Sequence, residues 1–108
     1  MANKYLRKYL IPSAATETTL YTVPDANTGI MRSLRVTNAG SATALITVTQ
    51  YTSGTPHYLQ KVRSLPVNET FDVFNGIPCI VEAGDIIKVT SSVATVHFYL
   101  SYLEVDRN

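Results

Sequence analysis

From residue 16 onward the chain is a series of short apolar runs, rich in Thr and Val, that turn-forming residues interrupt about every ten residues. Runs of this length and spacing are typical of β-sandwiches and β-barrels, and none has the length and period of an ordinary helix. The interrupting residues are Gly, Asn, Asp and Pro, which favour turn conformations. The pattern therefore predicts eight strands, at residues 18–23, 30–38, 44–52, 57–64, 69–74, 79–82, 85–91 and 95–105.

Apolar and polar residues alternate within several of these runs, so each such strand is expected to bury one face. The positions predicted to face the core are Ile30, Leu34, Val36, Phe71, Val73, Ile87 and Val89. The same rule places Met31 on the outward face of its strand, together with Ser33 and Arg35.

The last run carries apolar residues on both faces. Val96, Phe98, Leu100 and Tyr102 alternate with His97, Tyr99, Leu103 and Val105 on the other side. Two interpretations fit this pattern: a central strand covered on both sides, or a strand whose second face meets a partner chain.

Residues 1–12 fit either a helix with one apolar side or an amphipathic strand. They form either a terminal strand of the domain's own sheet or an arm that docks on a neighbouring subunit, and Lys4, Arg7 and Lys8 give them three of the nine positive charges. We therefore predict an all-β protein with a single antiparallel β-sandwich domain at residues 13–108. It should have about eight strands in a jelly-roll or immunoglobulin-like topology, preceded by the N-terminal arm or edge strand.

Composition narrows the function classes. The chain has 108 residues, with nine Lys and Arg against eight Asp and Glu, so its net charge is +1. Nucleic-acid binders carry a basic excess that neutralises phosphates, and we expect no nucleic-acid partner. Charged residues make up only 16%, which favours a surface in contact with another protein. No apolar stretch approaches the roughly 20 residues of a membrane helix, so no membrane role is expected.

Candidate chemistry is sparse. A single cysteine, Cys79, predicts no internal disulfide, and with two histidines it does not suffice for a structural zinc site. The single cysteine also predicts assembly in a reducing cytoplasm. Secretion is not expected, because Arg7 and Lys8 interrupt the apolar run that a signal peptide would need. His57 and His97 lack the neighbours of a nucleophilic triad, and the carboxylate pairs lie at strand ends. We therefore expect no enzyme activity, no cofactor and no metal.

Seven tyrosines leave one small-ligand alternative open, a carbohydrate or host-receptor binding module, because exposed aromatic rings stack on sugars. Such a module predicts a shallow pocket with two or three exposed Tyr beside Asp or Asn.

Five segments resemble small β-sandwich structural proteins of tailed-bacteriophage virions. They are TLYTVP at 19–24, IMRSLRVTN at 30–38, LPVNETF at 65–71, IVEAGDIIKV at 80–89 and YLSYLEV at 99–105. The resemblance covers residues 19–105 and implies a non-enzymatic virion protein, assembled in the host cytoplasm. It implies first a decoration (cement) protein that bridges subunits of the major capsid protein, and otherwise a tail, neck or baseplate component. Decoration proteins of this kind form dimers or trimers. The resemblance therefore implies that this chain forms a homo-oligomer.

Aromatic, Leu and Arg side chains are the usual energetic anchors of protein interfaces, which selects the candidate partner-binding residues. They come from the N-terminal segment, the loop at 52–58 and the second face of the last strand: Tyr5, Leu6, Arg7, Tyr9, Leu10, His57, Tyr58, His97, Tyr99 and Leu103.

Overall fold

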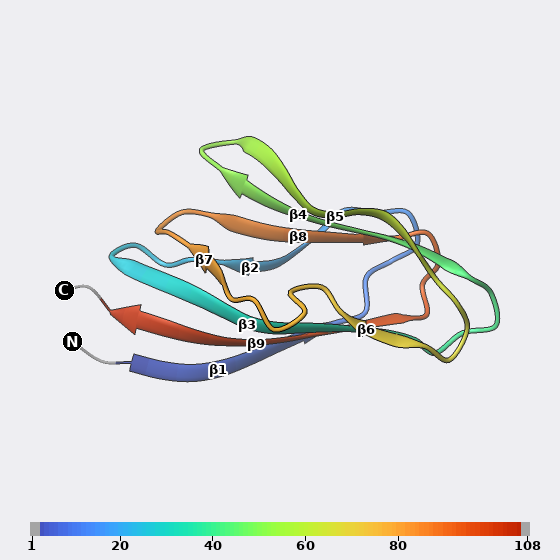
Figure 1. Ribbon diagram of the computed structural model, residues 1–108. Helices are drawn as coiled ribbons and strands as arrows, with labels where there is room; N and C mark the ends of the chain where they lie inside the picture. The colour runs from blue at the N-terminus through green and yellow to red at the C-terminus, as the bar shows by residue number, and fades with distance from the viewer. Residues whose placement is uncertain (1–2, 107–108) are drawn as a thin grey trace.

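The computed structural model describes residues 3–106, which fold into two antiparallel β-sheets packed face to face (Figure 1). The all-β sandwich predicted from the sequence is confirmed. Across the described residues there are nine strands and no helix: β1 Asn3–Leu10, β2 Thr18–Thr22, β3 Asn27–Asn38, β4 Ala44–Thr52, β5 Thr55–Leu65, β6 Thr70–Asp72, β7 Cys79–Val81, β8 Ile86–Ser91 and β9 Val96–Asp106.

The first sheet has the order β1-β9-β3-β6, and the short strand β7 also pairs with β3. The second sheet has the order β2-β8-β4-β5. Consecutive strands from β1 to β4 alternate between the two sheets, so each connection crosses from one layer to the other. The order differs from that of immunoglobulin domains, in which the first two strands are neighbours in one sheet.

The eight predicted strands correspond to β2 through β9, and β4 has the bounds predicted for it. The largest difference is the start of β3, which begins at Asn27 and not at Ile30. Residues 27–29 are drawn into the sheet because they pair with the end of β9, in a register that aligns Asn27 with Asp106. Long-range pairing of this kind overrides the local turn signal.

The alternation rule was wrong at two neighbouring positions, Ile30 and Met31. Ile30, predicted to face the core, pairs with Leu103 and lies half-buried on the outward face. Met31 is fully buried, although its place in the alternation predicted an outward side chain. The cause is a β-bulge in the pairing of β3 with β9, where the register shifts between Met31 and Ser33. A bulge adds one residue to a strand and so reverses the faces on its far side. Met31 and Leu34 therefore both point into the core.

The core fills the space between the two sheets. Its largest side chains without exposed area are Phe98, Met31, Leu34, Ile46, Ile87 and Leu100. Burial of a side chain of this size contributes about 2 kcal/mol to stability. Two polar residues, Asn38 and Ser91, are also fully buried; Nδ2 of Asn38 donates to the carbonyl oxygens of Ala42 and Leu65.

Strand β9 lies in the middle of its sheet, between β1 and β3. One of its faces is buried in the core through Val96, Phe98, Leu100 and Tyr102. The other face, with Tyr99, Leu103 and Val105, is half-buried, and within residues 3–106 no second layer covers it (Figure 1). The apolar residues on this second face are therefore presented at the surface.

Candidate partner-binding surface

The uncovered side of the first sheet is called here the β1–β9–β3 face. Strand register arranges its side chains in three rows that run across the strands. The aromatic row is Tyr9, Tyr99 and Arg35; the serine row is Arg7, Ser101 and Ser33; the apolar row is Tyr5, Leu103 and Ile30. Side chains opposite one another on antiparallel strands lie close enough to interact, so each row is a continuous strip.

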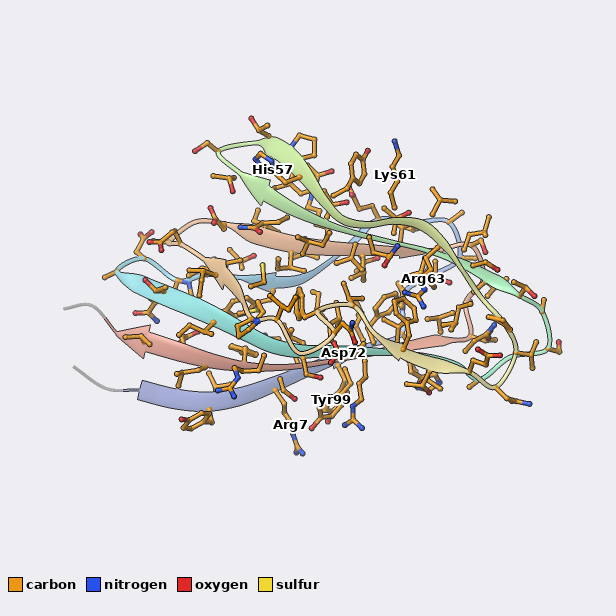
Figure 2. The ribbon with its side chains drawn as sticks, viewed as in Figure 1. Arg7, His57, Lys61, Arg63, Asp72 and Tyr99 are labelled. Atoms are coloured by element: carbon orange, nitrogen blue, oxygen red, sulfur yellow. The ribbon has the colours of Figure 1, made fainter. Side chains whose placement is uncertain are left out.

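The aromatic row is held by ring contacts. Tyr9 and Tyr99 stack with their ring centroids 6.3 Å apart and their planes at 11°. The guanidinium of Arg35 lies 5.1 Å from the centroid of Tyr99, and that of Arg7 lies 6.0 Å from the centroid of Tyr9. Figure 2 shows Arg7 and Tyr99 projecting on the same side, away from the second sheet. These contacts fix flat side chains in a defined orientation at the surface.

The apolar row is unusually exposed for its residue types. Tyr5 is 79% exposed, while Leu103 and Ile30 are half-buried. Ile80 on β7 extends the row, because it is the cross-strand neighbour of Ile30, and it is 52% exposed. Contiguous exposed apolar residues with a polar surround are typical of interaction sites.

An open groove of about 670 Å³ lies on this face, centred on the serine row. Tyr5 and Tyr99 line it from the two neighbouring rows, and Ser101 lies between Arg7 and Arg32. Leu6 and Tyr102, at intervening positions of β1 and β9, complete the lining. Arg32 is the extra residue of the β3 bulge, so the irregularity that turns Met31 inward also brings a guanidinium to the groove.

The face carries positive charge that no carboxylate side chain of residues 4–105 pairs with. Arg7, Arg32 and Arg35 are all exposed, and none of them forms an ion pair with a carboxylate of residues 4–105. The nearest acidic residue in the register is Asp72 on β6, opposite Arg35. Its Oδ1 accepts hydrogen bonds from the backbone N–H groups of Leu34 and Phe74, so this carboxylate is hydrogen-bonded to the backbone at the edge of its own sheet.

The structure brings five of the predicted partner-binding residues together on the β1–β9–β3 face: Tyr5, Arg7, Tyr9, Tyr99 and Leu103. Leu6 lines the groove and is 38% exposed. His97 is exposed at the end of the same face, opposite Thr37. Leu10 lies on the inner side and packs against the core.

His57 and Tyr58 belong to a different surface. They lie on β5, the edge strand of the second sheet, and both are exposed. Lys61 lies 4.7 Å from the ring centroid of Tyr58. Figure 2 shows His57 and Lys61 on the β4–β5 hairpin, on the side of the molecule opposite Arg7 and Tyr99. The ten predicted residues therefore form no single site.

Six residues of the face were not among the predicted partner-binding residues: Ile30, Arg32, Ser33, Arg35, Ile80 and Ser101. Arg and Ser at outward positions of a strand are normal for a solvated face. The available signal was the pair of arginines in a single strand, but their position beside the tyrosines depends on which strands are neighbours.

A second polar cluster ties the two sheets together. Tyr21 on β2 donates a hydrogen bond of 2.5 Å to Oε2 of Glu104 on β9, and Asn27 on β3 donates to Oε1 at 3.0 Å. Burial, and next the hydrogen bond to Glu104, raise the pKa of Tyr21 far above its usual value of 10.0. The phenol therefore stays protonated and acts as a structural donor.

Other reactive groups are isolated. Burial, with a smaller effect of Asp85, raises the pKa of the Cys79 thiol above its usual value, which disfavours the nucleophilic thiolate. His57 and His97 lie on different sheets. In the described part of the chain there is no group of three His, Cys, Asp or Glu residues able to hold a metal ion. Residues 3–106 also contain no helix that could cross a membrane.

Comparison with known proteins gives a limited result. No family model matches the chain, and no curated protein matches it either. Two crystal structures of a pentameric capsid protein isolated from metagenomic phage sequences are similar to it, each with 18% sequence identity and a TM-score of 0.48. The similarity covers 95% of this chain, and 64% and 62% of those chains. This chain thus spans slightly less than two thirds of their length.

Proposed function

We propose that this chain is a non-enzymatic structural protein of a tailed-bacteriophage particle, and that it decorates the capsid by docking through the β1–β9–β3 face. The observation that carries the proposal is the composition of that face. It combines stacked tyrosines, three arginines and an exposed apolar row on one face of a β-sheet. Tyr and Arg supply a large share of the binding energy in protein interfaces, and Leu and Ile provide the apolar area between them.

The strand order supports the same class of function. With β6 and β7 together in the place of one strand, the sheets β1-β9-β3-β6 and β2-β8-β4-β5 have the order of an eight-stranded jelly roll. Viral capsid proteins and lectins both use this fold, so the fold alone does not choose between them. The choice rests on the face and on the resemblance of residues 19–105 to phage virion proteins.

Capsid stabilisation follows from simple linkage. A protein that binds the assembled shell and not its free subunits stabilises the shell by mass action. A rigid sandwich that touches two neighbouring copies of the major capsid protein adds this stabilisation at every repeated position. We propose a dimer or trimer of this chain as the bound form, assembled on the particle in the host cytoplasm.

The test uses particles of the phage that encodes this chain, assembled without it, to which the purified protein is added. We expect cryo-EM density in many copies at the symmetry axes of the shell, and a higher temperature of DNA release. Density confined to one vertex would support the alternative role in the tail or neck. Absence of binding to any part of the particle would reject the proposal.

A matched pair of variants tests the docking face. Tyr9→Ala removes an exposed ring from the face, and Tyr58→Ala removes an exposed ring from β5 on the other side of the molecule. We expect the first variant to lose occupancy on the particle and the second to keep it. The carbohydrate alternative predicts instead that isolated protein binds glycans on an array.

A further inference from the structure

The groove beside Ser101 has a specific composition that the proposed docking role leaves unexplained. We propose that it binds a carboxylate side chain carried by an extended acidic segment of the partner protein, with Arg7 and Arg32 as its cationic walls. The inference rests on the proposed function for the existence of a protein partner, and it adds the chemistry by which that partner is recognised.

The first argument is the placement of the two guanidinium groups. Arg7 is the cross-strand neighbour of Ser101 on β1, and Arg32 reaches the groove from the β3 bulge on the other side. Neither forms an ion pair with a side chain of residues 4–105. A guanidinium presents parallel N–H donors that match the two oxygens of a carboxylate, and the Ser101 hydroxyl offers a third donor.

The second argument is charge complementarity over the whole face. Arg35 adds a third exposed guanidinium one row away, and the carboxylate of Asp72, opposite Arg35 on β6, accepts hydrogen bonds from the backbone of its own sheet. A second copy of this face would bring arginines against arginines. An acidic segment is therefore favoured over self-association through the same surface.

The third argument is spacing. Side chains on one side of an extended segment recur every two residues, a distance of about 6.6 Å. The rows of the face are also two residues apart along β1 and β9, as Tyr99, Ser101 and Leu103 show. A segment lying along β9 would place an acidic residue over the groove and, two positions away, an apolar residue over the Tyr5–Leu103–Ile30 row.

The lining of the groove argues against a neutral sugar. Of its seven lining residues, none is Asp or Asn, the partners that sugar hydroxyls usually find beside aromatic rings. An acidic polysaccharide shares the carboxylate and is kept as a separate outcome of the test.

The test is an NMR titration of the full chain with a synthetic peptide in which Thr residues alternate with Glu and Leu, so that Leu follows Glu by two positions. The matched peptide has Gln in place of Glu. We expect shifts at the Ser101 amide and at the Arg7 and Arg32 side chains, and binding of the Gln peptide about tenfold weaker, which corresponds to about 1.4 kcal/mol. Absence of shifts at Ser101, or equal binding of the two peptides, would overturn the proposal.

Variants locate the effect. Arg7→Gln with Arg32→Gln should abolish the preference for Glu over Gln, while Lys61→Gln with Arg63→Gln, which removes the same charge from β5, should keep it. Loss of the preference in both pairs would show a general effect of charge and refute the groove. Groove-specific binding of polygalacturonate without binding of the Glu peptide would also refute it.

The same variants separate this inference from the proposed function. If the Arg7 and Arg32 double variant binds particles as tightly as the wild type, docking stands and the carboxylate site fails. If the Glu peptide binds the groove but no particle binds the protein, the carboxylate site stands and the virion role fails.

Discussion

Tyr9 and Tyr99 come from the first and last strands of the chain, yet their rings stack almost in parallel, 6.3 Å apart. The stack joins an edge strand to the centre of its sheet on the solvent side. Stacked aromatic pairs contribute about 1 kcal/mol beyond the area they bury. A double-mutant cycle of Tyr9→Ala and Tyr99→Ala, measured by urea unfolding, should therefore give a coupling of about 0.5–1 kcal/mol. Additive effects of the two substitutions would mean that the rings do not stabilise each other.

The same residues should separate folding from docking. Tyr9 is 70% exposed, so we expect Tyr9→Ala to lower the free energy of unfolding by less than about 1 kcal/mol. Loss of an interface anchor typically costs about 2 kcal/mol of binding free energy. The affinity of the Tyr9→Ala variant for particles should therefore fall by more than about tenfold. A sedimentation assay with particles measures the second effect and urea unfolding the first. Unchanged particle binding by this variant would exclude the aromatic row from the interface.

Gly40 should tolerate no side chain. A Cβ atom there would lie against Oγ1 of Thr95 and 2.7 Å from its Cβ, an atom that cannot move without the backbone. We expect Gly40→Ala to lower the free energy of unfolding by about 1–3 kcal/mol because of this overlap. Thr95→Gly removes the opposing atoms and should recover most of the loss. An equal penalty in the Thr95→Gly background would show that overlap is not the cause.

Asn38 should be the most sensitive polar residue of the core. It is fully buried; Nδ2 donates to the Ala42 and Leu65 carbonyls at 2.8 and 3.0 Å, and Oδ1 accepts from the Gly40 N–H at 3.0 Å. Replacement by Ala leaves these backbone groups without their partner, at a cost of about 3 kcal/mol. Thr43→Ala, at an exposed position of the same loop, serves as the control for thermal unfolding. Similar melting temperatures for the two variants would contradict this account.

Stability should fall in alkaline solution because of Tyr21. Its folded pKa is raised above the value of 10.0 that it has when unfolded, chiefly by burial and then by the hydrogen bond to Glu104. Below pH 10 the Tyr21 phenol is protonated in both the folded and the unfolded state, so it makes no pH-dependent contribution to the free energy of unfolding. Above pH 10 only the unfolded state releases it, so the free energy of unfolding falls by up to about 1.4 kcal/mol per pH unit.

Tyr21→Phe provides the control for the alkaline effect. It removes the titrating hydroxyl, so the dependence above pH 10 should be shallower in this variant than in the wild type, leaving the weaker contribution of Tyr102, whose pKa is raised in the same direction. Equal slopes in denaturant titrations at several alkaline pH values would assign the effect to other groups.

Local pattern was sufficient for most of the fold. Alternation and turn residues predicted β4 at its observed bounds. A strand with one buried face has apolar residues at every second position, so its own sequence is sufficient to locate it. The same rule failed at Ile30 and Met31. The bulge there follows from the register between β3 and β9, and register depends on residues distant in the chain.

The candidate surface shows the same division. Tyr5, Arg7 and Tyr9 were selected for their residue types, and Tyr99 and Leu103 for an apolar second face. Nothing in the sequence indicated that these two groups are neighbours, which follows from the pairing of β1 with β9. Arg32 could not be found at all without the bulge, because its position beside Ser101 depends on an irregularity of the backbone.

The pairing of β1 with β9 also determines how the protein responds to mechanical force. The two strands are antiparallel, and Asn3 lies beside Val105, so their outer ends meet at one end of the sandwich. Tension between these ends would open the residue pairs one after another, like a zipper, without loading all of them at once. Tension applied at these two ends therefore loads one residue pair of the β1–β9 ladder at a time, beginning with Asn3 and Val105.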